Sequence, residues 1–168
     1  LINLAKKHLN ICGIGVDRNP DAVNIARASI SEEGLENRIK VFEGNMENLE
    51  ARPEFLEVDV MVSFFCGHDL WPQKNCLQAL KNLRTVFSHA ERFLLCDTYR
   101  TETLISPEIP IFTLGFEVTH SVMGQYIPSL REWMELFPQS DWKCVNCHHV
   151  EIPSSTIFDL RPETNQKI

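Results

Sequence analysis

The sequence predicts an α/β domain with a mainly parallel sheet and a C-terminal antiparallel hairpin. Two observations lead to this fold class. Apolar segments of strand length alternate with segments of helical periodicity along most of the chain, which is the order that gives a parallel sheet with helical crossovers. Residues 58–65 are apolar almost throughout, as expected for a strand that is buried on both faces. The 168 residues suffice for one domain with one core.

The N-terminal part of the chain is expected to hold a helix, a strand, a second helix and a second strand. No capping signal precedes Leu1, so we expect the first helix to be the tail of one that starts upstream. The first strand ends in Asp17, and Asn19 and Pro20 then supply a cap and a first-turn proline for the second helix. The four elements are predicted at residues 1–10, 11–16, 20–34 and 39–42.

The remainder of the chain continues this alternation. Residues 98–128 are less regular, because Pro107 and Pro110 interrupt them, and a connection of this length is usually functional. Ser129 and Glu132 have the spacing of a capping box that opens a short helix. We predict helices at residues 72–87 and 129–137, and strands at residues 58–65, 92–96, 142–152 and 156–160.

Composition excludes several classes of partner. The formal net charge is −7 and no stretch gathers Lys and Arg into a basic stripe, which argues against nucleic acid. No apolar run reaches the about 18 residues of a membrane-spanning helix, and the first ten residues lack the order of a signal peptide. The six cysteines mostly lie in apolar runs, which fits a reducing cytosol better than a disulfide framework. We therefore expect a cytoplasmic protein with no nucleic-acid partner and no membrane contact, and we leave a homodimer open.

Asp17 is the first candidate binding residue, because it ends a strand and precedes a capped helix. In doubly wound folds, ligands bind beyond the carboxyl ends of the strands, and a carboxylate there accepts hydrogen bonds from both ribose hydroxyls of a nucleoside. The alternative is a solvated turn carboxylate. Gly13 and Gly15 do not indicate a phosphate loop, since such a loop precedes the acid by about twenty residues and these glycines lie within the acid's own strand.

His68 and His120 are the candidate catalytic and metal-binding residues. His68 follows the predicted strand at residues 58–65, and His120 follows the one at residues 92–96, so both imidazoles are expected over one cleft. Two such imidazoles suit iron or zinc, whereas a single histidine is more often an ordinary core or surface residue. Asp69 either acts as a catalytic group that takes a proton or orients a metal-bound water, or caps the helix that follows.

The segment that begins at Asp17 resembles class I S-adenosylmethionine-dependent methyltransferases. The resemblance rests on the residues after the acid, NPDAV, and on the later turn EGNM. It implies a Rossmann-like methyltransferase fold in which Asp17 binds the ribose of S-adenosylmethionine and Asn45 and Met46 lie beside the adenine. Ser63 and Phe64, at the end of a later strand, are then expected to contact the cofactor as well.

The same resemblance implies that part of the domain lies upstream of Leu1. In that family a glycine loop holds the methionine part of the cofactor, and neither this loop nor the family's own first strand, which precedes it, is present here. Residues 1–168 would then form the C-terminal, larger part of one catalytic domain. Because the missing strand is central in such a sheet, its neighbours are expected to show unpaired edges and bare apolar faces.

The stretch from residue 63 to about residue 136 resembles a narrower group, the metal-dependent 2-oxo acid (phenylpyruvate) C-methyltransferases. The resemblance rests on the motifs GHDLWP, FTLGFE and MGQYIP. It implies that His68 and His120 hold the metal, and that the methyl group goes to the β-carbon of a 2-oxo acid such as phenylpyruvate through a metal-chelated enolate. The alternative is a metal-independent O- or N-methyltransferase with His68 as general base.

Two further sets of residues have less specific interpretations. Cys144, Cys147 and His148 have the spacing of a haem attachment or of half a zinc site. We reject both, because in a predicted strand residues three apart point to opposite faces. The second set either lines an aromatic substrate pocket or packs in the core and lid, and consists of Phe64, Phe65, Trp71, Phe116, Met123 and Tyr126.

Overall fold

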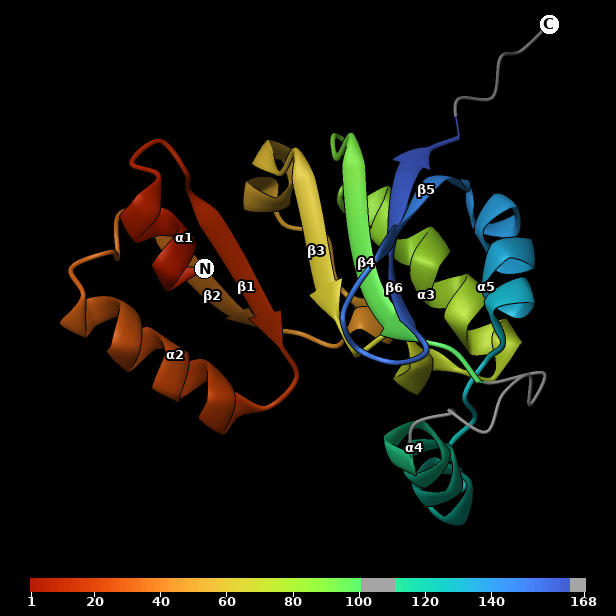
Figure 1. Ribbon diagram of the computed structural model, residues 1–168. Helices are drawn as coiled ribbons and strands as arrows, with labels where there is room; N and C mark the ends of the chain where they lie inside the picture. Colours follow the sequence, from red (N-terminus) through yellow and green to blue (C-terminus); the bar gives the residue numbers. More distant parts are fainter. Residues whose placement is uncertain (101–110, 164–168) are drawn as a thin grey trace, which may run out of the picture.

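Helices and strands alternate along much of the chain, as predicted. The computed structural model describes residues 1–100 and 111–163, with the backbone only for residues 111–114. Short 3-10 turns at Met46–Asn48, Pro53–Glu57, His68–Leu70 and Phe137–Ser140 join several of the elements. In chain order (Figure 1), the main elements are α1 (Ile2–Lys7), β1 (Gly13–Asp17), α2 (Pro20–Glu32), β2 (Ile39–Glu43), β3 (Val60–Phe64), α3 (Gln73–Val86), β4 (Arg92–Thr98), α4 (Ile111–Val122), α5 (Leu130–Leu136), β5 (Trp142–His149) and β6 (Ser155–Pro162).

The strands form two pieces of sheet. β1 pairs in parallel with β2, and β3 pairs in parallel with β4. β6 runs antiparallel between β4 and β5, so the second piece has the order β3-β4-β6-β5. The predicted parallel strands and the C-terminal antiparallel hairpin are therefore confirmed. The arrowheads of β1, β3 and β4 point the same way in Figure 1, so their carboxyl ends lie on one side of the molecule.

A break separates β1 from β3. In the described part of the chain, no hydrogen-bonded ladder joins these two strands. Val60, Val62 and Phe64 of β3 are 44%, 53% and 59% exposed, although residues two apart in a strand share one face and these three are large and apolar. The open strand edges and the bare apolar face that the family resemblance predicted are both found at this place.

The main core lies between α3 and the four-stranded piece of sheet. Trp133 and Trp142 are fully buried in it, and their indole N–H groups donate to the carbonyl oxygens of Thr98 and Leu80, each at 3.2 Å. This core thus buries large rings without leaving those two N–H groups unpaired. A much smaller core between α1, α2 and β2 consists of Ala5, Ile30, Leu35 and Ile39.

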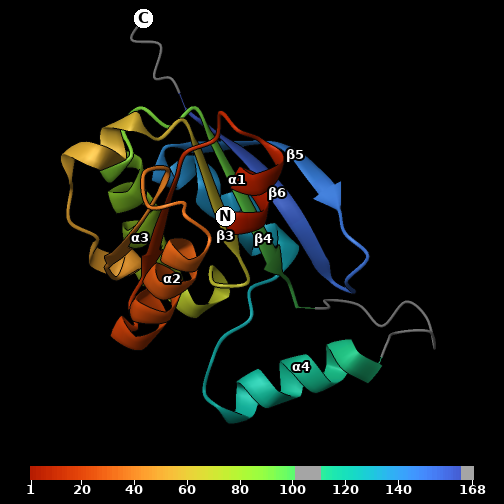
Figure 2. The ribbon, with the colours of Figure 1, turned by 90° about the vertical axis from the view of Figure 1, so that its left-hand side faces the viewer.

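Two predicted elements differ from the observed ones. α1 ends at Lys7 instead of continuing to residue 10, because the guanidinium of Arg38 binds the carbonyl oxygens of Ala5 and His8 at 3.0 and 2.7 Å and so caps the helix end. Part of the segment predicted to be irregular is helical: α4 contains no proline, and Pro107 and Pro110 lie outside the described residues. Figure 2 shows α4 apart from the sheet, beyond the carboxyl ends of the strands.

Among the described helices, none is long and apolar enough to cross a membrane.

Candidate active site

The turn after β3 brings His68 to the carboxyl end of the sheet. Phe65 has φ 52°, a left-handed backbone that is rare for a bulky side chain, and its N–H donates to the carbonyl oxygen of Cys96 at 2.8 Å. The bend directs the chain through Gly67 into the 3-10 turn His68–Leu70. Strain of this kind concentrates at functional sites, which makes the turn a candidate for one.

Asp97, at the end of β4, holds this turn in place. Its side chain is fully buried, and Oδ2 accepts the backbone N–H groups of Gly67 at 2.6 Å and His68 at 3.1 Å. Oδ1 accepts a hydrogen bond from Nδ1 of His68 at 2.7 Å. A Cβ atom on Gly67 would lie 2.6 Å from Asp97 Oδ2 and 3.2 Å from the ring of Trp133, so only glycine fits here. Asp97 directly follows the strand predicted at residues 92–96, and its contact with His68 was not predicted from the sequence.

The contacts of His68 determine its protonation. Burial lowers the pKa of the imidazole, but the hydrogen bond that His68 donates to Asp97 and the negative charges of Asp97 and Asp69 outweigh this effect, so the net pKa is raised. With Nδ1 bound to Asp97, Nε2 is the atom left for chemistry. Nε2 lies 3.7 Å from Oδ1 of Asp69, and the side-chain amide of Gln125 donates to this same carboxylate oxygen at 3.1 Å.

His120, on α4, lies next to His68, as expected from the sequence. Their ring centroids are 5.2 Å apart, with an interplanar angle of 74°. Nδ1 of His120 lies 2.8 Å from the carbonyl oxygen of Phe116 and donates to it, so Nε2 is again the atom left for chemistry. The ring of Phe116 packs on His120 at 3.9 Å. Within the described residues, no group of three or more His, Cys, Asp and Glu side chains is placed to hold a metal.

Asp17 and Asn45 lie at the carboxyl ends of β1 and β2. The Asp17 side chain is exposed, its Oδ1 accepts the N–H of Asn19 at 2.8 Å, and its carbonyl oxygen accepts the N–H of Gly44 at 2.9 Å. Asn45 Oδ1 accepts the N–H of Glu47 at 3.1 Å and so caps a 3-10 turn. The two predicted cofactor-binding turns are thus bonded to each other, and the Asp17 carboxylate keeps free acceptor positions toward solvent.

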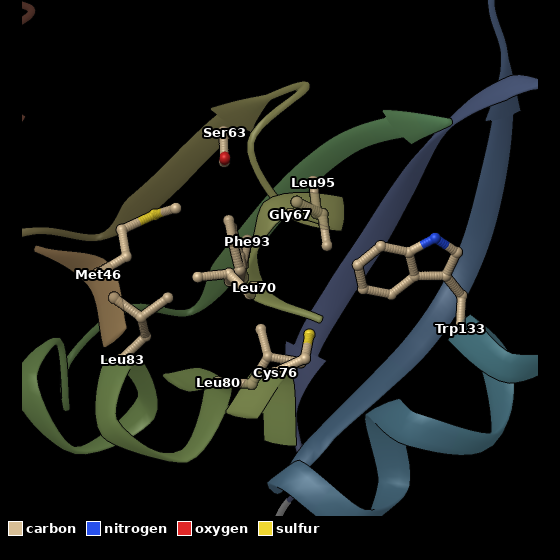
Figure 3. A pocket seen from close by; sticks show the side chains of 10 residues that line it. All are labelled: Met46, Ser63, Gly67, Leu70, Cys76, Leu80, Leu83, Phe93, Leu95 and Trp133. Carbon is tan, nitrogen blue, oxygen red and sulfur yellow. The ribbon is translucent and has the colours of Figure 1, made fainter. Parts of the chain in front are cut away.

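The other predicted cofactor residues lie closer to the core. Met46 is half-buried and packs against the main core, Ser63 is half-buried, and Phe64 is exposed. Figure 3 shows an apolar cavity between α3 and the sheet, with Ser63 and Gly67 at its upper rim. This cavity lies beneath the His68 turn and carries no ionisable side chain besides a buried thiol. It is lined by Met46, Ser63, Gly67, Leu70, Cys76, Leu80, Leu83, Phe93, Leu95 and Trp133.

Trp71 and Tyr126 form an aromatic pair beside the two histidines. Their ring centroids are 5.5 Å apart, and Trp71 also packs edge-on against Trp133 at 5.5 Å. The Tyr126 hydroxyl donates to Glu132 at 2.5 Å, and Glu132 accepts a hydrogen bond from Arg100 at 3.1 Å. Trp71 Nε1 is buried and has no hydrogen-bond partner among the described residues. Of the predicted aromatic set, Phe116 packs against both histidines, whereas Phe64, Phe65 and Met123 are exposed.

The fold is the Rossmann-like fold of methyltransferases. An O-methyltransferase from neocarzinostatin biosynthesis, solved with S-adenosylhomocysteine and 1,4-dihydroxy-2-naphthoic acid, superposes with a TM-score of 0.73 at 17% identity, over 95% of this chain and 44% of that one. A family model described as a methyltransferase domain matches residues 1–89. The chain belongs to this methyltransferase family.

Two curated relatives match nearly the whole chain. The methyltransferase ungE' of Aspergillus campestris is 36% identical over 169 residues, which cover 95% of this chain and 49% of the relative. An indolepyruvate C-methyltransferase of Streptomyces griseus is 26% identical over 157 residues, which cover 92% of this chain and 46% of the relative. The chain therefore spans about half the length of the curated relatives it matches.

Proposed function

We propose that this chain belongs to an enzyme that transfers a methyl group from S-adenosylmethionine to a small molecule. The family match and the methyltransferase relatives support this activity. The exposed carboxylate of Asp17 at a strand end suits the ribose hydroxyls, and Asn45 in the adjoining turn suits the adenine amino group. Met46, Ser63 and Phe64 complete the proposed cofactor contacts.

The acceptor in this proposal is the β-carbon of a 2-oxo acid such as phenylpyruvate. The observation that carries this choice is the pair His68 and His120. Nδ1 of His68 donates to the carboxylate of Asp97, Nδ1 of His120 donates to a backbone carbonyl oxygen, and the two rings lie edge to face with centroids 5.2 Å apart. Metal-binding histidines have this arrangement, because the outer hydrogen bond orients the ring and raises its basicity. The similarity to an indolepyruvate C-methyltransferase supports the same substrate class.

The two histidines therefore fit an ion such as iron or zinc, with the remaining positions left to the oxygens of the substrate and to water. A bound ion of this kind supplies Lewis-acid stabilisation of an enolate. Asp97 keeps His68 in the tautomer with Nδ1 protonated, and Asp69 takes the proton from the substrate β-carbon. The new carbon–carbon bond forms as the sulfonium–methyl bond breaks, which releases S-adenosylhomocysteine.

A second candidate function is metal-independent O- or N-methylation with His68 as general base. The specific observation in its favour is the hydrogen bond between His68 and the buried Asp97, which raises the pKa of the imidazole. A carboxylate in this position stabilises the imidazolium that forms when Nε2 takes a proton. Under this function His120 has no role in the chemistry, so the two candidates predict different effects of its removal.

The domain is proposed to include a further strand between β1 and β3, supplied by residues upstream of Leu1 together with the glycine loop. The support is the pair of unpaired strand edges and the exposed Val60, Val62 and Phe64 on β3. A parallel strand at this position would join the two pieces of sheet into one. The homodimer and the cytoplasmic location stay predictions.

Metal content of the full-length protein tests the first function. Wild type is compared with His68→Ala, His120→Ala and the control His8→Ala, whose side chain is exposed and distant from the site. We expect near-stoichiometric iron or zinc in wild type and in His8→Ala, and its loss in the two site variants together with methylation of 2-oxo acids. Absence of metal after anaerobic reconstitution, with activity retained in His120→Ala, would favour the second function.

A further inference from the structure

The cysteines of β5 do not lie as the sequence suggested. In a regular strand, Cys144 and Cys147 would point to opposite faces. The register to β6 shifts between Cys144 and Asn146, so that Cys144 lies opposite Leu160 and Cys147 lies opposite Phe158. Leu160 and Phe158 are two apart and share a face of β6. The prediction of opposite faces is therefore wrong, because a β-bulge inserts one extra residue between the two cysteines.

The bulge places the two thiols side by side. Their Sγ atoms are 3.8 Å apart. The Cys144 thiol donates to the carbonyl oxygen of Asn146 at 3.3 Å, and the side chain of Asn146 accepts the N–H of Cys147 at 2.9 Å. Cys144 is half-buried and Cys147 is exposed, so the pair is fixed on its inner side and open to solvent on its outer side.

The sulfur separation matches one edge of a tetrahedral metal–thiolate site. With zinc–sulfur bonds of about 2.3 Å and a tetrahedral angle, two thiolate ligands lie about 3.8 Å apart. The two cysteines therefore need no backbone movement to hold such an ion. A disulfide, in contrast, requires the sulfur atoms to approach to about 2.05 Å.

We propose that Cys144 and Cys147 form a binding site for a thiophilic divalent cation, zinc or cadmium, held by two thiolates and completed by water. Each thiol releases one proton as the ion binds, and no electron is transferred. Soft sulfur ligands select such ions over magnesium and calcium. The described residues contain no third clustered ligand, so the ion is expected to exchange with solution.

This site is separate from the two histidines. β5 is the outer strand of the four-stranded piece, and β6 and β4 lie between it and β3, which leads into the His68 turn. The inference does not depend on the proposed methyl transfer. Binding at the two thiols and binding at His68 and His120 can be measured apart, because only thiolate ligands give an ultraviolet charge-transfer absorption with cadmium.

The test is a titration of reduced full-length protein with cadmium under nitrogen. We expect the charge-transfer absorption to saturate at one cadmium ion per chain. Cys147→Ser, a change at an exposed side chain, should abolish it, and so should Cys144→Ser. Cys12→Ser, which removes an exposed cysteine of the N-terminal part, and the double variant His68→Ala/His120→Ala should both retain it.

Alkylation adds a second readout, because a bound ion blocks the thiols. Zinc should slow the reaction of Cys147 with iodoacetamide by more than about tenfold, as followed by mass spectrometry, while Cys12 reacts at an unchanged rate. No absorption at one equivalent of cadmium, an absorption that survives in Cys147→Ser, or equal alkylation with and without zinc would each overturn the proposal.

Discussion

The two pieces of sheet differ in how completely they are packed. One face of β1 and β2 rests on a small core formed with α1 and α2, and only partly buried residues of these strands, such as Phe42, reach the main core. In contrast, β3 to β6 share with α3 and α5 the main core, which buries Trp133, Trp142 and Phe158 completely. The N-terminal piece also faces an open edge of β3. Since stability follows buried apolar area, the C-terminal piece is the one able to hold a fixed geometry by itself.

The candidate site is divided between these two pieces. Asp17 and Asn45, the residues proposed for the ribose and the adenine of the cofactor, belong to the N-terminal piece, whereas His68 and Asp97 belong to the C-terminal piece. The predicted chemistry therefore rests on the well-packed part, and recognition of the nucleoside of the cofactor rests on the part with the small core. Ligand-binding elements are commonly drawn from the less stable regions of a protein.

The largest expected effect compares one core substitution in each piece. Leu160→Ala should lower the free energy of unfolding by about 4–5 kcal/mol, and Ile39→Ala by about 2 kcal/mol, because a small core collapses around the lost methyl groups more easily. The three tryptophans, Trp71, Trp133 and Trp142, all lie in the C-terminal piece. Tryptophan fluorescence therefore follows the C-terminal piece, whereas circular dichroism follows both pieces. In urea, Ile39→Ala should shift the unfolding transition measured by circular dichroism more than the transition measured by fluorescence. Equal shifts would show that the two pieces unfold as one.

The second effect concerns the pair His68 and Asp97. Asp97→Asn keeps the size of the side chain but removes the charge that orients the imidazole, so metal affinity or activity should fall by about 10- to 100-fold. The His68 pKa should fall as well, which NMR titration of the histidine ring protons measures. Asp159→Asn is a matched control, since Asp159 is a buried carboxylate paired with Arg92, away from the turn. Equal losses in both variants would mean that the effect is structural.

The third effect concerns cofactor affinity. Asp17→Asn should weaken the binding of S-adenosylmethionine by about tenfold, close to the roughly 1.5 kcal/mol of one charged hydrogen bond. Asp21→Asn, an exposed acid in the first turn of the neighbouring helix, serves as the control in calorimetric titrations. Because Asp17 is exposed, the unfolding midpoint of the variant without cofactor should stay unchanged. A lower unfolding midpoint without a loss of cofactor affinity would mean that Asp17 stabilises the fold and does not bind the cofactor.

Local sequence signals predicted most elements of the fold. Asn19 caps α2 and accepts the N–H of Asp21, and Ser129 and Glu132 form the expected capping box, because these interactions connect residues close in sequence. His68 and His120 were predicted to converge because both follow strands of one sheet edge. Each of these features depends on residue type and spacing alone.

Features that depend on pairing between distant residues were not predictable in the same way. The buried contact of Asp97 with His68 requires the parallel register of β3 and β4, and the approach of Cys144 to Cys147 requires a bulge against β6. One signal for Asp97 was present in the sequence, since an acid at the end of an otherwise apolar strand needs a partner when it is buried. The end of α1 was likewise set by Arg38, which lies far along the chain.

The smallest expected effect is a pH dependence of stability that arises in the C-terminal piece. The His68 pKa is raised in the folded protein, above the ordinary value of 6.5, so its contribution to stability is fully present below that value and is lost as the pH rises through the folded pKa. Urea unfolding of the metal-free protein, measured at several pH values, should show this loss in wild type. His68→Gln should not show it, because the side chain no longer titrates. An equal decline in both proteins would assign the pH dependence to other groups and leave the His68–Asp97 hydrogen bond without a measurable share in stability.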